Sequence, residues 1–350
     1  MSVVSSKGIK VLIVDDSAIV RKIFTEELSK EPDIEVIGTA SDPFIARDKI
    51  VKLKPDVITL DIEMPRMDGL TFLRKLMQHH PMPVIIVSSL TQKGSKLGLD
   101  ALSLGALDVI SKPDGSYSVG EMRKQLAEKI RGVTQINLDT VACRSRLPTI
   151  PTTQLLSAAK DRGNGKIIAI GASTGGTEAI KTVLVSMPTE APAILVVQHM
   201  PAYFTASFAE RLNRLCRIDV REAKDGDVLR RGIALVAPGN FHMLLKKSAH
   251  RYCIRIKSGP MVNHQRPSVD VLFKSVADHA AENAVGILLT GMGTDGADGL
   301  LQMKRSGART IAQDEKSCVV FGMPKEAIKA GAVETVASLE QIAGCALKMI

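Results

Sequence analysis

Short apolar runs alternate with amphipathic stretches along most of the chain, and this alternation limits the possible folds more than any other sequence feature. Residues 10–111 and residues 166–336 both show it. The apolar runs predict buried strands, and the amphipathic stretches predict helices. Because strands joined through helices lie parallel in one sheet, both halves are predicted to be α/β domains with parallel or mostly parallel sheets.

The predicted elements divide into two sets. In the first half, strands are predicted at Lys10–Val14, Ile34–Gly38, Asp56–Leu60, Pro83–Val87 and Leu107–Ser111, with helices at Ala18–Lys30, Asp42–Leu53, Gly69–Gln78, Gly94–Leu104 and Ser118–Arg131. In the second half, strands are predicted at Lys166–Gly171, Ala193–Gln198, Ile233–Ala237, Ala284–Thr290, Arg309–Ala312 and Val333–Val336. A hairpin of His242–Lys247 with Arg251–Lys257 interrupts them, and Ser338 and Gln341 have the spacing of a capping box before the last helix.

The periodicity lapses between the two halves, in a stretch that contains Pro148 and Pro151. We therefore predict a first domain at residues 1–133, a linker at 134–165 with one short helix near 155–160, and a second domain at 166–350. The first domain is expected to be a doubly wound, five-stranded parallel sheet. The second is expected to be a mostly parallel α/β domain that carries the hairpin.

Cysteine content and hydropathy bear on where the protein works. The chain of 350 residues has five cysteines and no Cys-x-x-Cys pair, which argues against a disulfide framework or a zinc site. No apolar run approaches the ~20 residues that span a bilayer, and the first residues lack the apolar core of a signal peptide. We expect a cytoplasmic protein without membrane insertion.

The net charge of +9 indicates an anionic partner of some kind. Aromatic residues make up only 3% of the chain and Trp is absent, so a base-stacking surface for nucleic acid is not expected. The basic residues are scattered rather than gathered in one block. An acidic protein partner is the preferred interpretation.

Five polar residues of the first domain follow predicted strands at their carboxyl ends. Asp15 and Asp16 follow the first strand, Asp61 the third, Ser88 the fourth and Lys112 the fifth. In an open parallel sheet these ends form one edge, where ligands bind. Three crowded carboxylates repel one another, and a hard divalent cation such as Mg²⁺ relieves that repulsion. The pattern predicts a magnesium site at which a carboxylate receives a phosphoryl group, held by a lysine and a hydroxyl.

These residues resemble the conserved motifs of response-regulator receiver domains, which have a flavodoxin-like fold. The resemblance is carried by Val14–Ser17, Asp61–Gly69, Ser88 and Lys112–Pro113. It implies that Asp61 accepts phosphate from a sensor histidine kinase. It also implies that Asp15, Asp16 and Asp61, with the carbonyl of Glu63, hold Mg²⁺.

The same resemblance gives Ser88 and Lys112 the role of sensing the phosphoryl group. Many receiver domains carry an aromatic switch residue three positions before the lysine, but Val109 stands there in this chain. The resemblance therefore implies a switch that runs through Ser88 and its loop.

A glycine-rich turn in the second domain predicts an exposed nucleophile. A predicted strand runs into Gly171–Gly176, with the sequence Gly-Ala-Ser-Thr-Gly-Gly, and a helical pattern follows from Thr177. This matches the Gly-x-Ser-x-Gly elbow, in which a sharp turn from strand to helix exposes the serine hydroxyl, here that of Ser173. A phosphate-binding loop is the main competing interpretation of such a turn.

Two further residues complete a candidate catalytic set. His199 follows the next predicted strand, and Asp295 follows the very apolar strand at 284–290. Serine is a weak nucleophile until a base removes its proton, and the base works best when an acid fixes its tautomer. Ser173, His199 and Asp295 can supply these roles. Their order along the chain differs from that of the α/β-hydrolase fold, so a different hydrolase scaffold is expected.

A dinucleotide-binding turn competes for the same segment. Gly291, Gly293 and Gly296 have the spacing of the fingerprint, and Asp314 lies about twenty residues further on. However, Asp295 would stand inside the turn that must hold a pyrophosphate, and its negative charge would repel that ligand. An acid that orients an imidazole suits this position better.

The second domain resembles the protein-glutamate methylesterases of bacterial chemotaxis. The resemblance is carried by Ile170–Gly176, Gln198–Met200, Ala237–Gly239, Arg266–Asp270 and Leu289–Gly296. It implies hydrolysis of glutamyl methyl esters, and deamidation of glutamines, on methyl-accepting chemotaxis receptors, with no cofactor for the hydrolysis. Ser173 would attack, His199 would act as base and then acid, and Asp295 would orient it. The N–H of Met292, with Thr174 nearby, is the candidate oxyanion or substrate contact.

Three function classes remain in view. A phosphorylation-activated serine hydrolase is preferred over a response regulator with a non-catalytic output domain and over a dinucleotide-binding enzyme. No helix-turn-helix pattern supports DNA binding. His242 and the segment Arg266–Asp270 are expected to line the substrate cleft, although Asp270 is equally placed to cap a helix.

Overall fold

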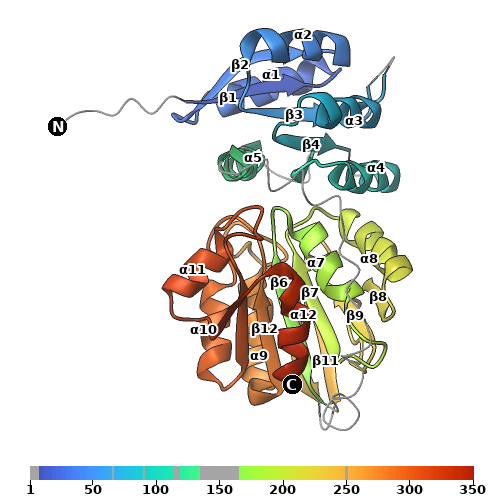
Figure 1. Cartoon of the computed structure of the whole chain (residues 1–350), viewed down its shortest axis with the longest axis vertical. Coiled ribbons are helices and arrows are strands. Elements are labelled where there is room, and N and C mark those ends of the chain that lie inside the picture. Colours follow the sequence, from blue (N-terminus) through green and yellow to red (C-terminus); the bar gives the residue numbers. More distant parts are fainter. Residues whose placement is uncertain (1–7, 65–66, 90, 113–118, 135–164, 249–250) are drawn as a thin grey trace, which may run out of the picture. The chain divides into compact units, whose positions relative to one another are not determined.

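The chain folds into two compact units, Met1–Ala142 and Cys143–Ile350. The computed structural model describes residues 8–64, 67–89, 91–112, 119–134, 165–248 and 251–350 (Figure 1). The predicted linker at 134–165 and its short helix near 155–160 lie almost wholly outside the described residues. No described helix is long and apolar enough to span a membrane.

The first unit is a five-stranded sheet in which every pairing is parallel. Its strands, in the order β2-β1-β3-β4-β5, are β1 (Ile9–Val14), β2 (Ile34–Ala40), β3 (Val57–Asp61), β4 (Val84–Ser88) and β5 (Asp108–Ser111). The helices are α1 (Ala18–Leu28), α2 (Pro43–Leu53), α3 (Gly69–His79), α4 (Gln92–Ser103) and α5 (Val119–Thr134). All five predicted strands are present, and β3 and β4 are buried at every residue, as expected of inner parallel strands.

Local side-chain capping fixes where these helices begin. Asp42 accepts from the Phe44 N–H at 2.9 Å, Asp68 from the Thr71 N–H at 2.8 Å and Thr91 from the Gly94 N–H at 2.9 Å. Each bond satisfies an N–H of the first turn that has no partner within the helix. Because each helix starts at a fixed residue, the loop between strand end and helix is held in one conformation.

The second unit is a seven-stranded sheet with a separate two-stranded hairpin. The sheet, whose pairings are all parallel, has the order β14-β13-β12-β6-β7-β9-β8. Its strands are β6 (Ile167–Ala172), β7 (Ala193–Gln198), β8 (Asp219–Glu222), β9 (Ile233–Val236), β12 (Ala284–Leu288), β13 (Arg309–Gln313) and β14 (Thr335–Ala337). The antiparallel hairpin pairs β10 (His242–Ser248) with β11 (Arg251–Lys257).

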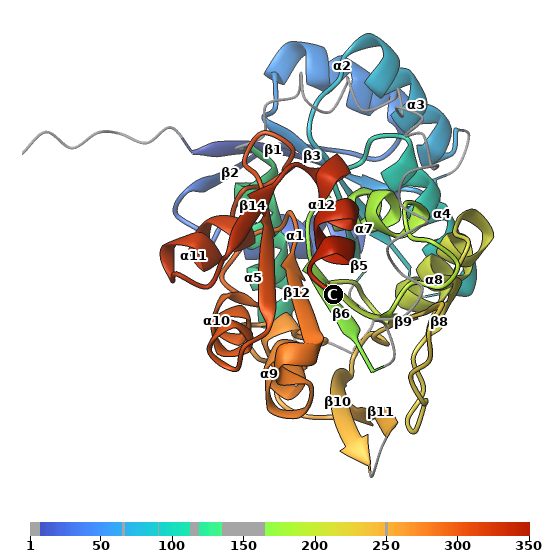
Figure 2. The same ribbon diagram turned by 60° about the horizontal axis from the view of Figure 1, so that its bottom comes forward.

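Helices cover both faces of this sheet (Figures 1 and 2). They are α7 (Gly176–Val185), α8 (Phe204–Leu215), α9 (Val269–His279), α10 (Ala297–Arg305), α11 (Met323–Lys329) and α12 (Leu339–Lys348), with a short 3₁₀ turn at Ala281–Asn283. Helices α7 and α12 pack together on one face, while α9 and α10 pack together on the other. Hairpin strand β10 packs beside α9.

The structure differs from the sequence prediction at β8 and at the start of α12. Strand β8 was not predicted because it is a short, polar edge strand in which only Val220 is fully buried. Ser338 occupies the N-cap position of α12, but its side chain caps nothing, so the predicted capping box is wrong. The Leu339 N–H instead donates to Ser317 Oγ at 3.0 Å, a distant partner that local spacing could not reveal.

In each sheet, the later strands are added first on one side and then on the other side of the strand that comes first in the sequence. That strand is β1 in the first unit, with β2 and β3 as neighbours, and β6 in the second, with β7 and β12 as neighbours. Loops leave the carboxyl ends of these neighbours toward opposite faces, which opens a crevice for ligands. The predicted acidic residues and the predicted nucleophile follow these strands directly.

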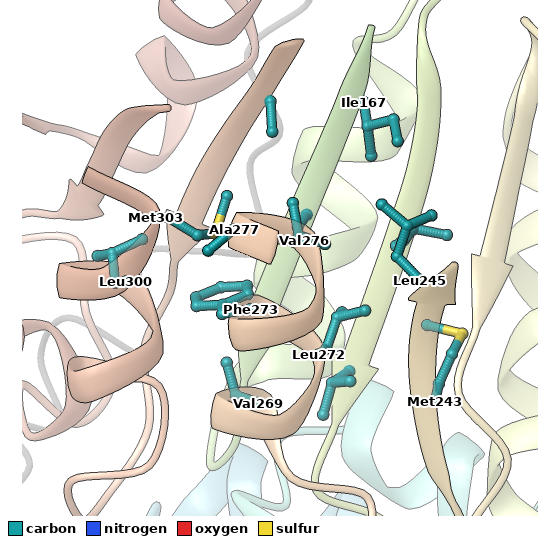
Figure 3. Packing of buried hydrophobic residues seen from close by; sticks show 14 of the residues in the cluster. Ile167, Met243, Leu245, Val269, Leu272, Phe273, Val276, Ala277, Leu300 and Met303 are labelled. Carbon is teal, nitrogen blue, oxygen red and sulfur yellow. The ribbon is translucent and has the colours of Figure 1, made fainter. Parts of the chain in front are cut away.

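The main core of the second unit lies between the sheet and the layer formed by α9, α10 and the hairpin. Figure 3 shows Phe273 of α9 beside Leu300 and Met303 of α10, with Met243 and Leu245 of β10 further along the same layer. All five side chains are at most 1% exposed. The hairpin therefore contributes core side chains and is not a loose surface arm.

Replacing Phe273 by Ala should lower the free energy of unfolding of the second unit by about 3–5 kcal/mol, because it leaves a cavity among α9, α10 and the sheet. Urea denaturation followed by circular dichroism measures the change. Phe241, which is 43% exposed, is the matched control, and its replacement by Ala should cost less than about 0.5 kcal/mol. Equal losses in the two variants would contradict this description of the core.

Candidate functional sites

The acidic residues of the first unit meet at the carboxyl edge of its sheet. Asp15 and Asp16 follow β1 and Asp61 ends β3, and one carboxylate oxygen from each lies within 4.8 Å of the others. Asp15 and Asp61 are buried, whereas Asp16 is exposed. The loop after β1 turns sharply because the Ser17 N–H donates to Asp15 Oδ1 at 2.8 Å.

Lys112 reaches into this cluster from the end of β5. Its Nζ lies 2.7 Å from Asp61 Oδ2 and 3.1 Å from Asp15 Oδ2. Burial raises the pKa of Asp61 to about 6, although the hydrogen bond from Lys112 opposes the shift. Burial also raises the pKa of Asp15, again against the attraction of Lys112. One ammonium group thus neutralises only part of the charge of the cluster.

Ser88 and Glu63 lie at the same edge but are bonded elsewhere. Ser88 Oγ donates to the Gly94 carbonyl at 3.1 Å, which ties the end of β4 to the first turn of α4. The Glu63 side chain accepts from Ser89 Oγ at 2.9 Å, and the Glu63 N–H donates to Asp61 Oδ1 at 3.1 Å. The side chain of Glu63 therefore faces the loop after β4 and not the carboxylates, so only its carbonyl remains a candidate ligand.

The donor set fits a magnesium ion. Asp15 Oδ2 is a buried carboxylate oxygen whose one partner among the described residues is the Lys112 ammonium at 3.1 Å, and it stands within the cluster beside Asp16 and Asp61. An oxygen-only set with excess negative charge suits a hard divalent cation. Among the described residues, no other group of His, Cys, Asp or Glu has this arrangement.

Ser173 stands on a tight turn between β6 and α7. Its carbonyl accepts from the Gly176 N–H at 2.7 Å, and its own N–H donates to the Thr290 carbonyl at 3.0 Å. Gly175 adopts a φ of 77°, a left-handed conformation that glycine accepts without strain. A Cβ on Gly291 would lie 2.7 Å from Ser173 Cβ, so only glycine lets the loop after β12 approach the serine this closely.

His199 and Asp295 form a buried pair beside this turn. The Asp295 carboxylate lies with Oδ2 2.8 Å from His199 Nε2, and both side chains are 3% exposed. A carboxylate can only accept, so in the neutral ring Nε2 carries the proton and Nδ1 does not. Ala172 and Gln198 are register partners on adjacent parallel strands, so Ser173 and His199, the next residues, emerge side by side.

The start of α9 supplies the hydrogen bonds that hold Asp295. Its carboxylate accepts from the N–H groups of Val269 at 2.7 Å and Asp270 at 3.2 Å, from Ser268 Oγ at 2.7 Å and from Asn263 Nδ2 at 3.0 Å. Burial alone would raise the pKa of Asp295, but the hydrogen bonds from His199, Asn263 and Ser268 outweigh it and hold the pKa below its usual value. The group remains an anion despite its burial.

One contact of the predicted triad is missing among the described residues: the hydrogen bond between Ser173 and His199. His199 Nδ1 is buried and has no partner among the described residues, and no hydrogen bond of Ser173 Oγ occurs in that part of the chain. Such contacts are often long or misaligned before substrate binds. His199 Nδ1 is thus a buried imidazole nitrogen without a partner among the described residues, on a residue that follows the strand next to that of Ser173.

The predicted oxyanion contacts lie next to Ser173. Thr174 is buried in the turn, and its carbonyl accepts from Thr290 Oγ1 at 3.0 Å. Met292 is half-buried, directly after the glycine that contacts Ser173, and its N–H makes no hydrogen bond within the described chain. The Met292 N–H is therefore available for a ligand beside the serine.

The geometry argues against a pyrophosphate at the glycine-rich turn before α10. The Asp270 carboxylate already accepts from the N–H groups of Gly296 at 3.0 Å and Gly299 at 2.7 Å, the groups that would hold a phosphate. Asp295 adds a second negative charge in the same turn. Asp314, the candidate ribose ligand, accepts instead from the Ser317 N–H at 3.0 Å.

Sequence reasoning missed Asn263 and Ser268 as supports of the site. Both lie between the hairpin and α9, where no periodic pattern exists, although Ser268 stands three residues before the N–H that it caps.

His242 was expected near the substrate. It is buried, and its ring accepts from the Ser268 N–H through Nδ1 and binds the Pro260 carbonyl through Nε2. His242 thus fixes the loop that supports Asp295.

The first parallel α/β unit has a receiver-type acidic site, and the second has a serine, a histidine and an aspartate at one sheet edge. Together they define a response regulator with a hydrolase-like output unit. Residues 168–345 match the family model described as CheB methylesterase, and residues 11–124 match the response regulator receiver domain. The chain belongs to the CheB methylesterase family, with a receiver domain at its N-terminal end.

Relatives and a solved structure agree with this assignment. A protein-glutamate methylesterase/protein-glutamine glutaminase of Syntrophus aciditrophicus is 63% identical over 98% of this chain and 99% of its own length. A protein of the same description from Salmonella typhi is 53% identical over 95% of each chain. The crystal structure of the Thermotoga maritima CheB methylesterase catalytic domain is 36% identical, with a TM-score of 0.52, and covers 54% of this chain and all of that one.

Asp61 should make the stability of the first unit depend on pH. Its pKa of about 6 lies above the ordinary value of 3.8, so the folded state holds this proton more tightly, and stability falls as the pH rises from about 4 through 6. At pH 7.5 without divalent cations, the free energy of unfolding of Asp61→Asn should be about 1–3 kcal/mol larger than that of wild type. The gain should shrink toward pH 4.5.

Calorimetric unfolding of the full chain at both pH values measures this difference. Asp68→Asn is a matched control, because Asp68 caps α3 and its pKa is lowered by hydrogen bonds from Thr71. That variant should lose stability at neutral pH. A gain in Asp61→Asn of equal size at both pH values would rule out a buried, titrating carboxylate.

Proposed function

We propose that this protein is a phosphorylation-activated serine hydrolase that demethylates glutamate methyl esters, and deamidates glutamines, on methyl-accepting chemotaxis receptors. The observation that carries the proposal is the His199–Asp295 pair, held beside the Ser173 turn in a chain of the CheB methylesterase family. The relatives named above are described by both activities. The proposed reaction takes place in the cytoplasm, on soluble parts of the receptors.

In the proposed reaction Ser173 Oγ attacks the γ-carbonyl carbon of the modified side chain while His199 Nδ1 takes the hydroxyl proton. The positive imidazole is stabilised by Asp295, which holds Nε2–H throughout. Collapse of the tetrahedral intermediate breaks the bond to the methoxy or amino group, which leaves with the proton from Nδ1 as methanol or ammonia. Water, activated by the same nitrogen, then releases a glutamate carboxylate from Ser173.

Negative charge on the carbonyl oxygen needs donors that are already in place. The N–H of Met292 is the proposed donor, since it lies directly after Gly291, whose backbone contacts Ser173. The turn at Thr174 and the start of α7 contribute the favourable end of a helix dipole at the same edge. No cofactor enters these steps, since each needs only a proton acceptor, an acid and hydrogen-bond donors.

The receiver unit would regulate this chemistry. A sensor histidine kinase is the proposed phosphodonor, Asp61 the acceptor, and Asp15, Asp16 and Asp61 with the Glu63 carbonyl the ligands of Mg²⁺. When bound, the ion would neutralise the incoming phosphoryl oxygens. Lys112, already 2.7 Å from Asp61, is placed to pair with the phosphoryl group, and Ser88 would respond to it by leaving Gly94.

Replacing Ser173 by Ala should lower methanol release from methylated receptors by about four orders of magnitude or more, because no other group can take the acyl group. Gas chromatography or a radiolabelled methyl group measures the product. Ser186→Ala, at the distant end of α7, is the matched control and should keep full activity. Substantial hydrolysis by a folded Ser173→Ala protein would exclude the proposed mechanism.

Phosphorylation should raise the rate only when Asp61 is present. With Mg²⁺ and a small phosphodonor such as acetyl phosphate, wild type should become more active and Asp61→Asn should not respond.

A chain that lacks residues 1 to about 146 should be more active than the unphosphorylated full chain, because the receiver would no longer restrain the catalytic edge. A truncated protein that is folded but no faster would exclude inhibition by the receiver.

A further inference from the structure

Asp295, the partner of His199, and Asp270 lie at the starts of two different helices, and each carboxylate binds the start of the helix to which the other belongs. Asp295, just before α10, accepts from the Val269 and Asp270 N–H groups at the start of α9. Asp270, in the first turn of α9, accepts from the Gly296 and Gly299 N–H groups at the start of α10. The reciprocal bonds lock the two helix ends together, so neither carboxylate can turn without disturbing the other.

A single side-chain amide joins these two carboxylates. Asn263 Nδ2 donates to Asp270 Oδ2 at 2.8 Å and to Asp295 Oδ1 at 3.0 Å, so its two hydrogens serve two different acids. Asn263 lies in an exposed loop with a φ of 51°, a left-handed conformation that asparagine adopts readily. It approaches the buried acids from solvent and is not part of the core.

The amide relieves a repulsion that would otherwise disturb the site. Burial raises the pKa of Asp270, and the nearby charge of Asp295 adds to this effect, whereas Asn263 opposes it. The other charged or titratable groups on these elements include Lys274 of α9, Asp298 of α10, Arg266 before α9 and His242 of β10. Of these, Lys274 attracts Asp270, and His242 binds the Ser268 backbone.

We propose that Asn263 is a positioning residue for catalysis, which keeps Asp295 ionised and aimed at His199 Nε2 by bridging it to Asp270. The inference rests on the proposed hydrolase function and deepens it, since Asn263 acts through Asp295 and touches no reacting atom. An uncharged double donor is required here. A third carboxylate would add repulsion, and a side chain without an amide would leave two acids facing each other with nothing between them.

Two substitutions separate these effects. Asn263→Gly removes both donors and keeps the left-handed backbone accessible, while Asn263→Asp is nearly isosteric and replaces the donors with a negative charge. The matched control is His264→Gly, in the same exposed loop with a similar φ of 60°. All variants are made in the full chain, and thermal unfolding verifies that each is folded.

Methanol release from methylated receptors is followed over pH for each variant. Asn263→Gly should lower kcat by about tenfold to a hundredfold with KM unchanged, because transition-state stabilisation is lost and substrate contact is not. Asn263→Asp should lower kcat further. It should also move the acidic limb of the pH–rate profile to higher pH, because an added carboxylate favours the protonated form of His199.

The proposal is overturned if Asn263→Gly behaves like His264→Gly, or if it raises KM with kcat unchanged. An Asn263→Asp profile without displacement of the acidic limb also overturns it. Failure of the hydrolase function itself is distinguished by Ser173→Ala measured in parallel. If that variant keeps its activity the reaction does not use this site, whereas if only the Asn263 variants match wild type the bridging role alone is excluded.

Discussion

The second unit depends on one electrostatic constraint, which is that a buried carboxylate must remain charged beside an imidazole. Asp295 is 2% exposed, and a buried anion without partners would take up a proton instead. The start of α9 prevents this with two backbone N–H groups and the Ser268 hydroxyl, all directed at one carboxylate. Fixed dipoles replace water, so the charge persists beside the His199 imidazole.

The sheet topology brings the other groups to the same place. Strand β6 lies between β7 and β12, so residues that follow these three strands come together without long connections. Close approach is then allowed by glycines, since a side chain at Gly291 would collide with Ser173. The first unit uses the same arrangement, with Asp15 after β1 and Asp61 at the end of the neighbouring β3. One architectural rule therefore places both the acidic site and Ser173.

Residues at strand ends could be predicted from the sequence, and the residues that support them could not. The strands were readable as apolar runs, and the parallel fold then required Ser173, His199 and Asp295 to share an edge. Asn263 gave no such signal, because it lies in an aperiodic loop and its partners are far away in sequence. The polar edge strand β8 was missed because its burial pattern is not that of an inner strand. Long-range polar contacts leave no local periodicity from which to predict them.

The central claim is that Asp295 fixes the tautomer of His199, so that Nδ1 is the base facing Ser173. Nitrogen NMR of histidine-labelled protein tests it directly, with the signals of one of seven histidines assigned through a His199→Gln variant. The structure predicts that, when the ring is neutral, Nε2 carries the proton and Nδ1 is unprotonated. A neutral ring with its proton on Nδ1 would contradict the account, because that nitrogen could not accept the proton of Ser173.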